Sequence, residues 1–161
     1  MGKKLKYAAL GVVALVGVAI GLYFLRYKDY PYYKKMERLR VTNFTKDNIT
    51  VTGNVICHNP NGVEVRLAGA DFDVEANGKL VTEVHQTFQS TIAAESDFTV
   101  PIKASFSPKK IFKLKDLLGA AFTSLKSKAI HMRYNGVVHV GLLGEDVEIE
   151  VDYEEDIPLK E

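Results

Sequence analysis

An uncharged stretch of 19 residues, YAALGVVALVGVAIGLYFL at positions 7–25, most constrains what this chain can form. Nineteen helical residues at about 1.5 Å each extend roughly 28 Å, close to the hydrocarbon thickness of about 30 Å in a bilayer. Lysines precede the stretch, and Arg26 and Lys28 come after it. These features predict a single-pass transmembrane helix whose partner is the lipid bilayer.

Two other interpretations of residues 7–25 are less favoured. A cleaved signal peptide also has a basic start and an apolar stretch, but here the stretch continues past the small residues at 17–21. A buried core helix would need a polar face at helical spacing, and none is present. We therefore expect a retained anchor, with membrane-interface side chains on both sides of it: Tyr7, Tyr23, Arg26, Tyr27 and Lys28.

The charges around this helix give two opposite indications of the side of the membrane on which the rest of the chain lies. Three lysines precede the helix, whereas six Lys and Arg residues lie between positions 26 and 40, so the count favours the cytoplasm. A very short tail rich in lysine instead favours export of the residues on the C-terminal side of the helix. We expect the exported, extracytoplasmic side.

The remaining chain divides by composition into a linker and one domain. We assign a basic tail to residues 1–6, a basic and aromatic linker to 26–38, a single domain to 39–158 and a short tail to 159–161. About 120 residues are sufficient for one domain with its own core. Residues 145–161 carry nine acids and one lysine, which indicates a solvated acidic surface.

Apolar residues alternate with polar ones through most of this domain, which predicts half-buried β-strands. The alternation runs through 49–57, 63–67, 72–76, 98–106 and 147–153. It changes phase at Ala68-Gly69-Ala70, which predicts a β-bulge, and we interpret Asn135-Gly136 as a second bulge. Predicted turns separate the strands at Asn59-Pro60-Asn61-Gly62, Asn77-Gly78 and Leu143-Gly144-Glu145.

One segment has helical spacing instead. Ser107-Pro108 is a favourable helix start, and the apolar residues after it recur at helical intervals, so we predict one amphipathic helix over 108–126. The predicted fold is mainly β: an antiparallel β-sandwich of about seven or eight strands with one amphipathic helix, preceded by the transmembrane helix.

Several motifs succeed one another in an order typical of one family. They are Asn59-Pro60-Asn61, Phe72, Asn77-Gly78, Ile92-Ala93-Ala94, Val100-Pro101-Ile102, and Tyr134 with Gly136. Over residues 38–158 the chain thereby resembles the late embryogenesis abundant (LEA) type 2 family, whose module is the water stress and hypersensitive response (WHy) domain. Two positions depart from the family pattern: Ala93 replaces a proline, and Thr82 replaces a glycine that often comes after the hairpin.

The resemblance implies a fibronectin type III-like sandwich with a helix. It also implies a non-catalytic role in protection against desiccation or other stress, and some relatives carry an N-terminal membrane anchor. We therefore expect a membrane-anchored protein that shields partner proteins or the membrane. Two alternatives remain open: an envelope assembly or adaptor subunit with a specific but unknown protein partner, and a lipid-handling module.

The side chains that could carry chemistry are better explained structurally. His58, His85, His131 and His139 lie on separate predicted elements without metal-ligand spacing, so we expect exposed or hydrogen-bonded histidines. Asp71, Asp73 and Glu75 fit a solubilising strand face, and Cys57 fits a buried thiol. We found no phosphate loop, nucleophile elbow or zinc motif. We therefore expect no enzyme activity, cofactor, metal, small-molecule substrate or nucleic acid.

Overall fold

The computed structural model describes residues 16–22 and 29–159. Residues 16–22 are helical, and within the described residues no helix is long and apolar enough to cross a membrane. Most of the predicted transmembrane helix, together with Tyr7, Tyr23, Arg26, Tyr27 and Lys28, lies outside the described residues, as do the basic tail 1–6 and residues 160–161.

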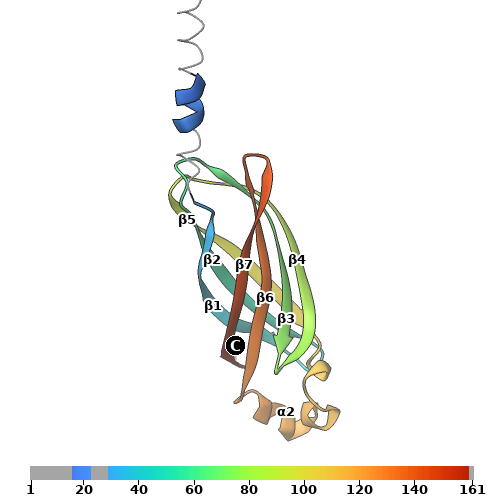
Figure 1. Ribbon diagram of the computed structural model, residues 1–161. Coiled ribbons are helices and arrows are strands. Elements are labelled where there is room, and N and C mark those ends of the chain that lie inside the picture. Colours follow the sequence, from blue (N-terminus) through green and yellow to red (C-terminus); the bar gives the residue numbers. More distant parts are fainter. Residues whose placement is uncertain (1–15, 23–28, 160–161) are drawn as a thin grey trace, which may run out of the picture.

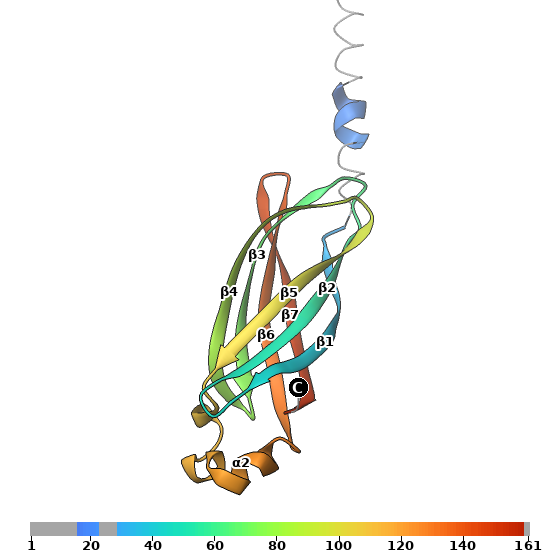
Figure 2. The ribbon, with the colours of Figure 1, turned by 180° about the vertical axis from the view of Figure 1, so that it is seen from behind.

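Two antiparallel sheets pack face to face to form the domain (Figures 1 and 2). The three-stranded sheet has the order β1-β2-β5, and the four-stranded sheet has the order β4-β3-β6-β7. The strands are β1 (Tyr32–Phe44), β2 (Ile49–Asn59), β3 (Val65–Ala76), β4 (Lys79–Ile92), β5 (Ser96–Phe106), β6 (Ala129–Leu142) and β7 (Glu145–Pro158). This confirms a mainly β, two-sheet fold, although β1 begins inside the segment assigned to the linker.

The core lies between the two sheets, where the apolar positions of each alternating strand meet. β2 contributes Ile49, Val51, Val55 and Cys57, all fully buried. β6 contributes a large buried aromatic side chain, Tyr134, whose hydroxyl has no hydrogen-bond partner within the described part of the chain. The alternation seen in the sequence therefore corresponds to the inward and outward faces of each strand.

The predicted bulge in β3 is confirmed. The register of β3 with both of its neighbours shifts between Leu67 and Gly69. Inward positions are odd before the shift and even after it, as with Leu67 and Phe72. A Cβ on Gly69 would lie 2.8 Å from the carbonyl oxygen of Gln86, so the bulge brings two backbones too close together for a side chain.

The predicted bulge at Asn135-Gly136 is wrong. β6 pairs with β3 and β7 through these residues without a change of register. Gly136 instead lies opposite Phe72, where a Cβ would be 2.0 Å from the carbonyl oxygen of Asp71. A glycine at this point permits close approach of two paired strands, which sequence pattern alone does not separate from a bulge.

The single helix predicted over 108–126 is also wrong. The segment contains two short 3-10 helices, η1 (Pro108–Lys110) and η2 (Leu114–Leu117), and a seven-residue helix, α2 (Gly119–Leu125). Leu118 is extended and Gly119 has a φ of 54°, so neither continues a right-handed helix. Leu117 and Leu125 are buried at the end of the core, whereas Leu114 and Leu118 are exposed.

Two of the predicted turns are tight hairpins. Asn77 and Gly78 have φ values of 50° and 74° and join β3 to β4. Leu143 and Gly144 have φ values of 57° and 84° and join β6 to β7. Both turns place two residues in the left-handed region, which matches the twist of the paired strands.

Leu143 is poorly suited to its turn, because a side chain other than Asn, Asp or Gly is strained at positive φ. Replacing Leu143 with asparagine is expected to raise the free energy of unfolding by about 0.5 to 1 kcal/mol. Urea denaturation of the two proteins measures the difference. The matched control is Leu143→Ala, which removes the same exposed leucine but lacks the short polar group that lets asparagine adopt positive φ. An equal gain from alanine would contradict the conformational explanation.

Candidate functional site

A basic hollow on the outer surface of the three-stranded sheet is the candidate binding site. It begins at a bulge in β1, where Arg38 and Leu39 together lie opposite Gly53. Arg38 has a φ of 56°, a strained value for a side chain of this size. Leu39 turns inward over Gly53, while Arg38 and Arg40 are exposed. The bulge thus places an additional cation on the outer face.

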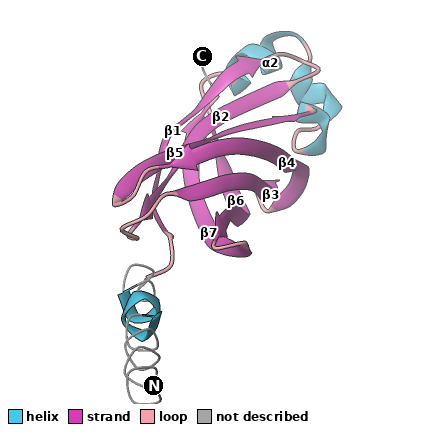
Figure 3. Ribbon diagram, turned by 90° about the horizontal axis from the view of Figure 1, so that it is seen from above, coloured by secondary structure: helices cyan, strands magenta, loops and turns pink. Residues whose placement is uncertain are grey.

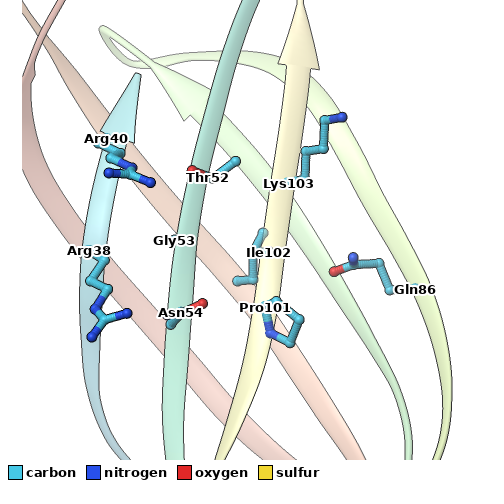
Figure 4. A pocket seen from close by; sticks show the side chains of 9 residues that line it. All are labelled: Arg38, Arg40, Thr52, Gly53, Asn54, Gln86, Pro101, Ile102 and Lys103. Carbon is cyan, nitrogen blue, oxygen red and sulfur yellow. The ribbon is translucent and has the colours of Figure 1, made fainter. Parts of the chain in front are cut away.

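The hollow has a volume of about 270 Å³ and lies across β1, β2, β5 and the neighbouring part of β4. Figure 4 shows its lining: Arg38, Arg40, Thr52, Gly53, Asn54, Gln86, Pro101, Ile102 and Lys103. None of the three cations forms an ion pair within the part of the chain that the structure describes. The side-chain oxygen of Gln86 is buried there without a hydrogen-bond partner. Unpaired guanidinium and ammonium groups around polar side chains can bind a carboxylate or phosphate.

The outer surface of the four-stranded sheet has the opposite charge. Carboxylates occupy alternate positions of β3 and β7, against Arg66 and Arg133. They are Asp71, Asp73, Glu75, Asp146, Glu148, Glu150, Asp152, Glu154 and Asp156. Arg133 donates two hydrogen bonds to Asp152, at 2.9 and 2.8 Å. The domain therefore presents a basic face on one sheet and an acidic face on the other.

Each histidine is hydrogen-bonded to a carboxylate, in agreement with the sequence interpretation. Asp71 lies between two of them, 2.7 Å from Nδ1 of His85 and 2.8 Å from Nε2 of His139. His131 pairs with Asp156 and His58 with Asp97. Within the described residues, no three His, Cys, Asp or Glu side chains are grouped so that they could hold a metal ion.

These pairs change the protonation of the histidines. Hydrogen bonding to Asp71 raises the pKa of His85, and hydrogen bonding to Asp156 raises the pKa of His131. For His139, partial burial opposes charging, but the hydrogen bonds to Asp71 and Asp146 outweigh it and its pKa is raised. The carboxyl of Asp71 in turn has a lowered pKa because both histidines hydrogen-bond to it.

The raised histidine pKa values predict how stability depends on pH. A group with a folded pKa above its unfolded value of about 6.5 stabilises the fold fully below that value and loses the contribution as pH rises through the folded pKa. The free energy of unfolding, measured by urea denaturation, is therefore expected to fall from pH 6 toward pH 8. The His85→Gln, His139→Gln double variant should flatten this decrease, and an unchanged slope would contradict the assignment.

The Asn59-Pro60-Asn61-Gly62 segment forms the loop between β2 and β3. Asn59 is fully buried, and its amide donates hydrogen bonds to the carbonyl oxygens of Val63 and Ala93, both at 3.0 Å. Its side-chain oxygen accepts from the backbone N–H of Asn61 at 3.1 Å. The Asn59 side chain therefore joins this loop to the one between β4 and β5, and it is not available to a ligand.

The remaining candidate residues have structural roles. In the hairpin turn, Asn77 accepts a hydrogen bond from the backbone N–H of His131, which ties the turn to β6. Cys57 is buried, and burial raises the pKa of its thiol to about 12, so it is a thiol and not a thiolate at neutral pH.

Sequence reasoning misses the basic hollow because it assigns Arg38 to a linker. The available signal is the phase change between Met36 and Val41.

Comparison with known proteins supports the fold. No family model matches the chain, and no curated protein matches it. A solved structure from Archaeoglobus fulgidus is 11% identical with a TM-score of 0.53, covering 77% of this chain and 94% of its own. One from Arabidopsis thaliana is 14% identical with a TM-score of 0.56, covering 80% of each chain. A candidate LEA protein is 13% identical with a TM-score of 0.54, covering 97% of this chain and 88% of its own. At these identities the likeness shows a shared fold.

Proposed function

We propose that this chain is a membrane-anchored, non-catalytic protection protein that shields partner proteins or the bilayer through the outer faces of its sandwich. The observation that carries the proposal is the pair of oppositely charged faces around a packed core, with the basic hollow on one and the carboxylate rows on the other. Such faces can engage proteins of either charge as water is withdrawn.

Three further points support this proposal. The candidate LEA protein has the same fold at low identity, which is compatible with the WHy resemblance over residues 38–158. The strand order, three strands against four, is compatible with the fibronectin type III-like arrangement that the resemblance implies. The uncharged residues 7–25 would hold the domain near a membrane surface, on the exported side in our proposal.

A drying assay tests this function. The full chain, reconstituted in phosphatidylcholine nanodiscs, is dried with a labile enzyme, and the recovered activity is compared with that obtained with empty nanodiscs and with an equal mass of inert protein. We expect higher recovery with the full chain, and a lower gain when Glu148 and Glu150 are replaced by glutamine. Recovery no better than with inert protein would overturn the proposal.

The basic hollow favours one second candidate, an adaptor that binds an acidic segment of a specific protein. Arg38, Arg40 and Lys103 would hold its carboxylates, because no carboxylate of the described chain pairs with them. Chemical cross-linking in membranes distinguishes the two functions. A single stoichiometric partner that is lost in the Arg40→Gln, Lys103→Gln variant indicates an adaptor, whereas protection without such a partner indicates the shield.

A further inference from the structure

The end of the sandwich that carries α2 gathers separate segments of the chain. We call it the distal end and define it as residues 45–48, 77–80 and 107–128. Figures 1 and 2 place it opposite the helical residues 16–22, and Figure 3 shows the helices covering this end of both sheets. Contacts hold the segments together: the rings of Phe44 and Phe122 lie 5.0 Å apart, and Nζ of Lys110 donates to the carbonyl oxygen of Val81 at 2.5 Å.

The distal end is strongly basic. It contains eight lysines and two acids, Asp47 and Asp116. The lysines are Lys46, Lys79, Lys109, Lys110, Lys113, Lys115, Lys126 and Lys128. None of them forms an ion pair within the ranges that the structure describes, and two of them lie over the ring of Phe122. The neighbouring carboxyl of Asp156 is occupied by His131. Eight lysines and two acids give the distal end a net charge of +6, which is available to attract an anionic surface.

Large apolar side chains are exposed among these lysines. The exposed fraction is 64% for Leu114, 55% for Leu118 and 54% for Leu80. Leu114 lies between Lys113 and Lys115 in the sequence, and all three side chains are exposed, so an apolar group and two cations share one short stretch of surface. Other residues fill the core of the sandwich, so these exposed leucines have no packing role there. A surface that pairs exposed leucine with lysine fits the boundary between lipid headgroups and acyl chains.

We propose that the distal end binds the surface of an anionic lipid bilayer, with Leu114 and Leu118 inserted among the acyl chains and the lysines at the headgroup phosphates. The chain enters β1 at the opposite end of the sandwich from the 45–48 turn, so an anchor before β1 and binding at the distal end would let one chain connect two facing bilayers. This connection rests on the anchor in the proposed function, but binding at the distal end does not. A nucleic acid is a poorer fit, because the ring of Phe122, on which a base could stack, is already covered by two lysines.

Vesicle capture tests the inference with the full chain. The protein is first reconstituted in phosphatidylcholine vesicles, and flotation reports whether it is anchored. Fluorescent vesicles that contain phosphatidylserine are then added, and the fraction captured is measured. We expect capture that weakens with salt and is absent for labelled vesicles of phosphatidylcholine alone. If the chain does not enter the first vesicles, the anchor fails, and the same chain is added directly to the anionic vesicles to measure distal-end binding by sedimentation.

Matched variants separate the distal end from general charge. Lys113→Gln with Lys115→Gln should lower vesicle partitioning by about fivefold for each lysine. Leu114→Gln should lower it while leaving the net charge unchanged. The control, Lys35→Gln with Arg66→Gln, removes two cations elsewhere and should have little effect. Equal losses in the control, binding to neutral and anionic vesicles alike, or stronger binding to single-stranded nucleic acid than to vesicles would overturn the inference.

Discussion

Replacing Gly136 with alanine is expected to lower the free energy of unfolding by about 3 kcal/mol, the upper part of the usual range for overpacking. The new Cβ would lie 2.0 Å from the carbonyl oxygen of Asp71 and 2.7 Å from Cα of Phe72. Both are backbone atoms of a central strand, so β3 and β6 must move apart and weaken the hydrogen bonds that pair them. Urea denaturation at constant pH measures the loss.

Gly141→Ala is the matched control, because Gly141 lies on the same strand and pairs with the same neighbour. Its new Cβ would lie 3.6 Å from the nearest atom, the Cβ of Arg66, which is ordinary contact. The control should change stability by less than about 0.5 kcal/mol. If both variants lose equally, the effect comes from strand propensity and not from the close approach of β3 and β6.

Replacing Asn59 with alanine is expected to lower the free energy of unfolding by about 2 to 4 kcal/mol. The change removes the hydrogen bonds that the Asn59 amide donates to the carbonyl oxygens of Val63 and Ala93, although the Ala93 oxygen still accepts from Oγ of Ser96. Each hydrogen bond contributes about 0.5 to 1.5 kcal/mol. It also removes the oxygen that fixes the backbone of Asn61. Thermal and urea unfolding both report the loss.

A second variant at Asn59 and a control at Asn135 identify the cause of this loss of stability. Asn59→Asp keeps the oxygen that accepts from Asn61 but loses both donated hydrogen bonds, and it should be at least as unstable as alanine because a buried carboxylate would face two carbonyl oxygens. Asn135→Ala alters an exposed asparagine and should have a small effect. A nearly native Asn59→Asp protein would show that the donated hydrogen bonds do not hold the two loops together.

Several parts of the fold are predictable because their signals are local. Alternation along 49–57 and 98–106 predicts the two faces of β2 and β5, and the change of phase near Gly69 predicts the bulge in β3. The Asn77-Gly78 pair predicts a two-residue hairpin because both residues accept positive φ. The interruption between η2 and α2 is not predictable, because the apolar spacing of 111–125 is the same for a continuous helix.

The candidate site is less predictable than the fold. The three cations of the hollow come from β1 and β5, which are distant in the sequence, and the bulge at Arg38 is visible only as a mismatch between apolar positions. The distal end likewise combines Lys46, Leu80 and Leu114 from three segments. The lysines of 109–115 are evident in the sequence, yet only the packing shows that they share one end with other cations and exposed leucines.

The sequence by itself determined the alternating strands β2, β3, β5 and β7, the two hairpin turns and the bulge in β3, because backbone conformation and the alternation of side chains depend on neighbouring residues along the chain. The tertiary structure alone decided that Gly136 lies against Asp71 and Phe72, that Asn59 joins two loops, and that one sheet is basic and the other acidic. The physical reason is that close packing, buried hydrogen bonds and summed charge are properties of atoms brought together in space from distant positions.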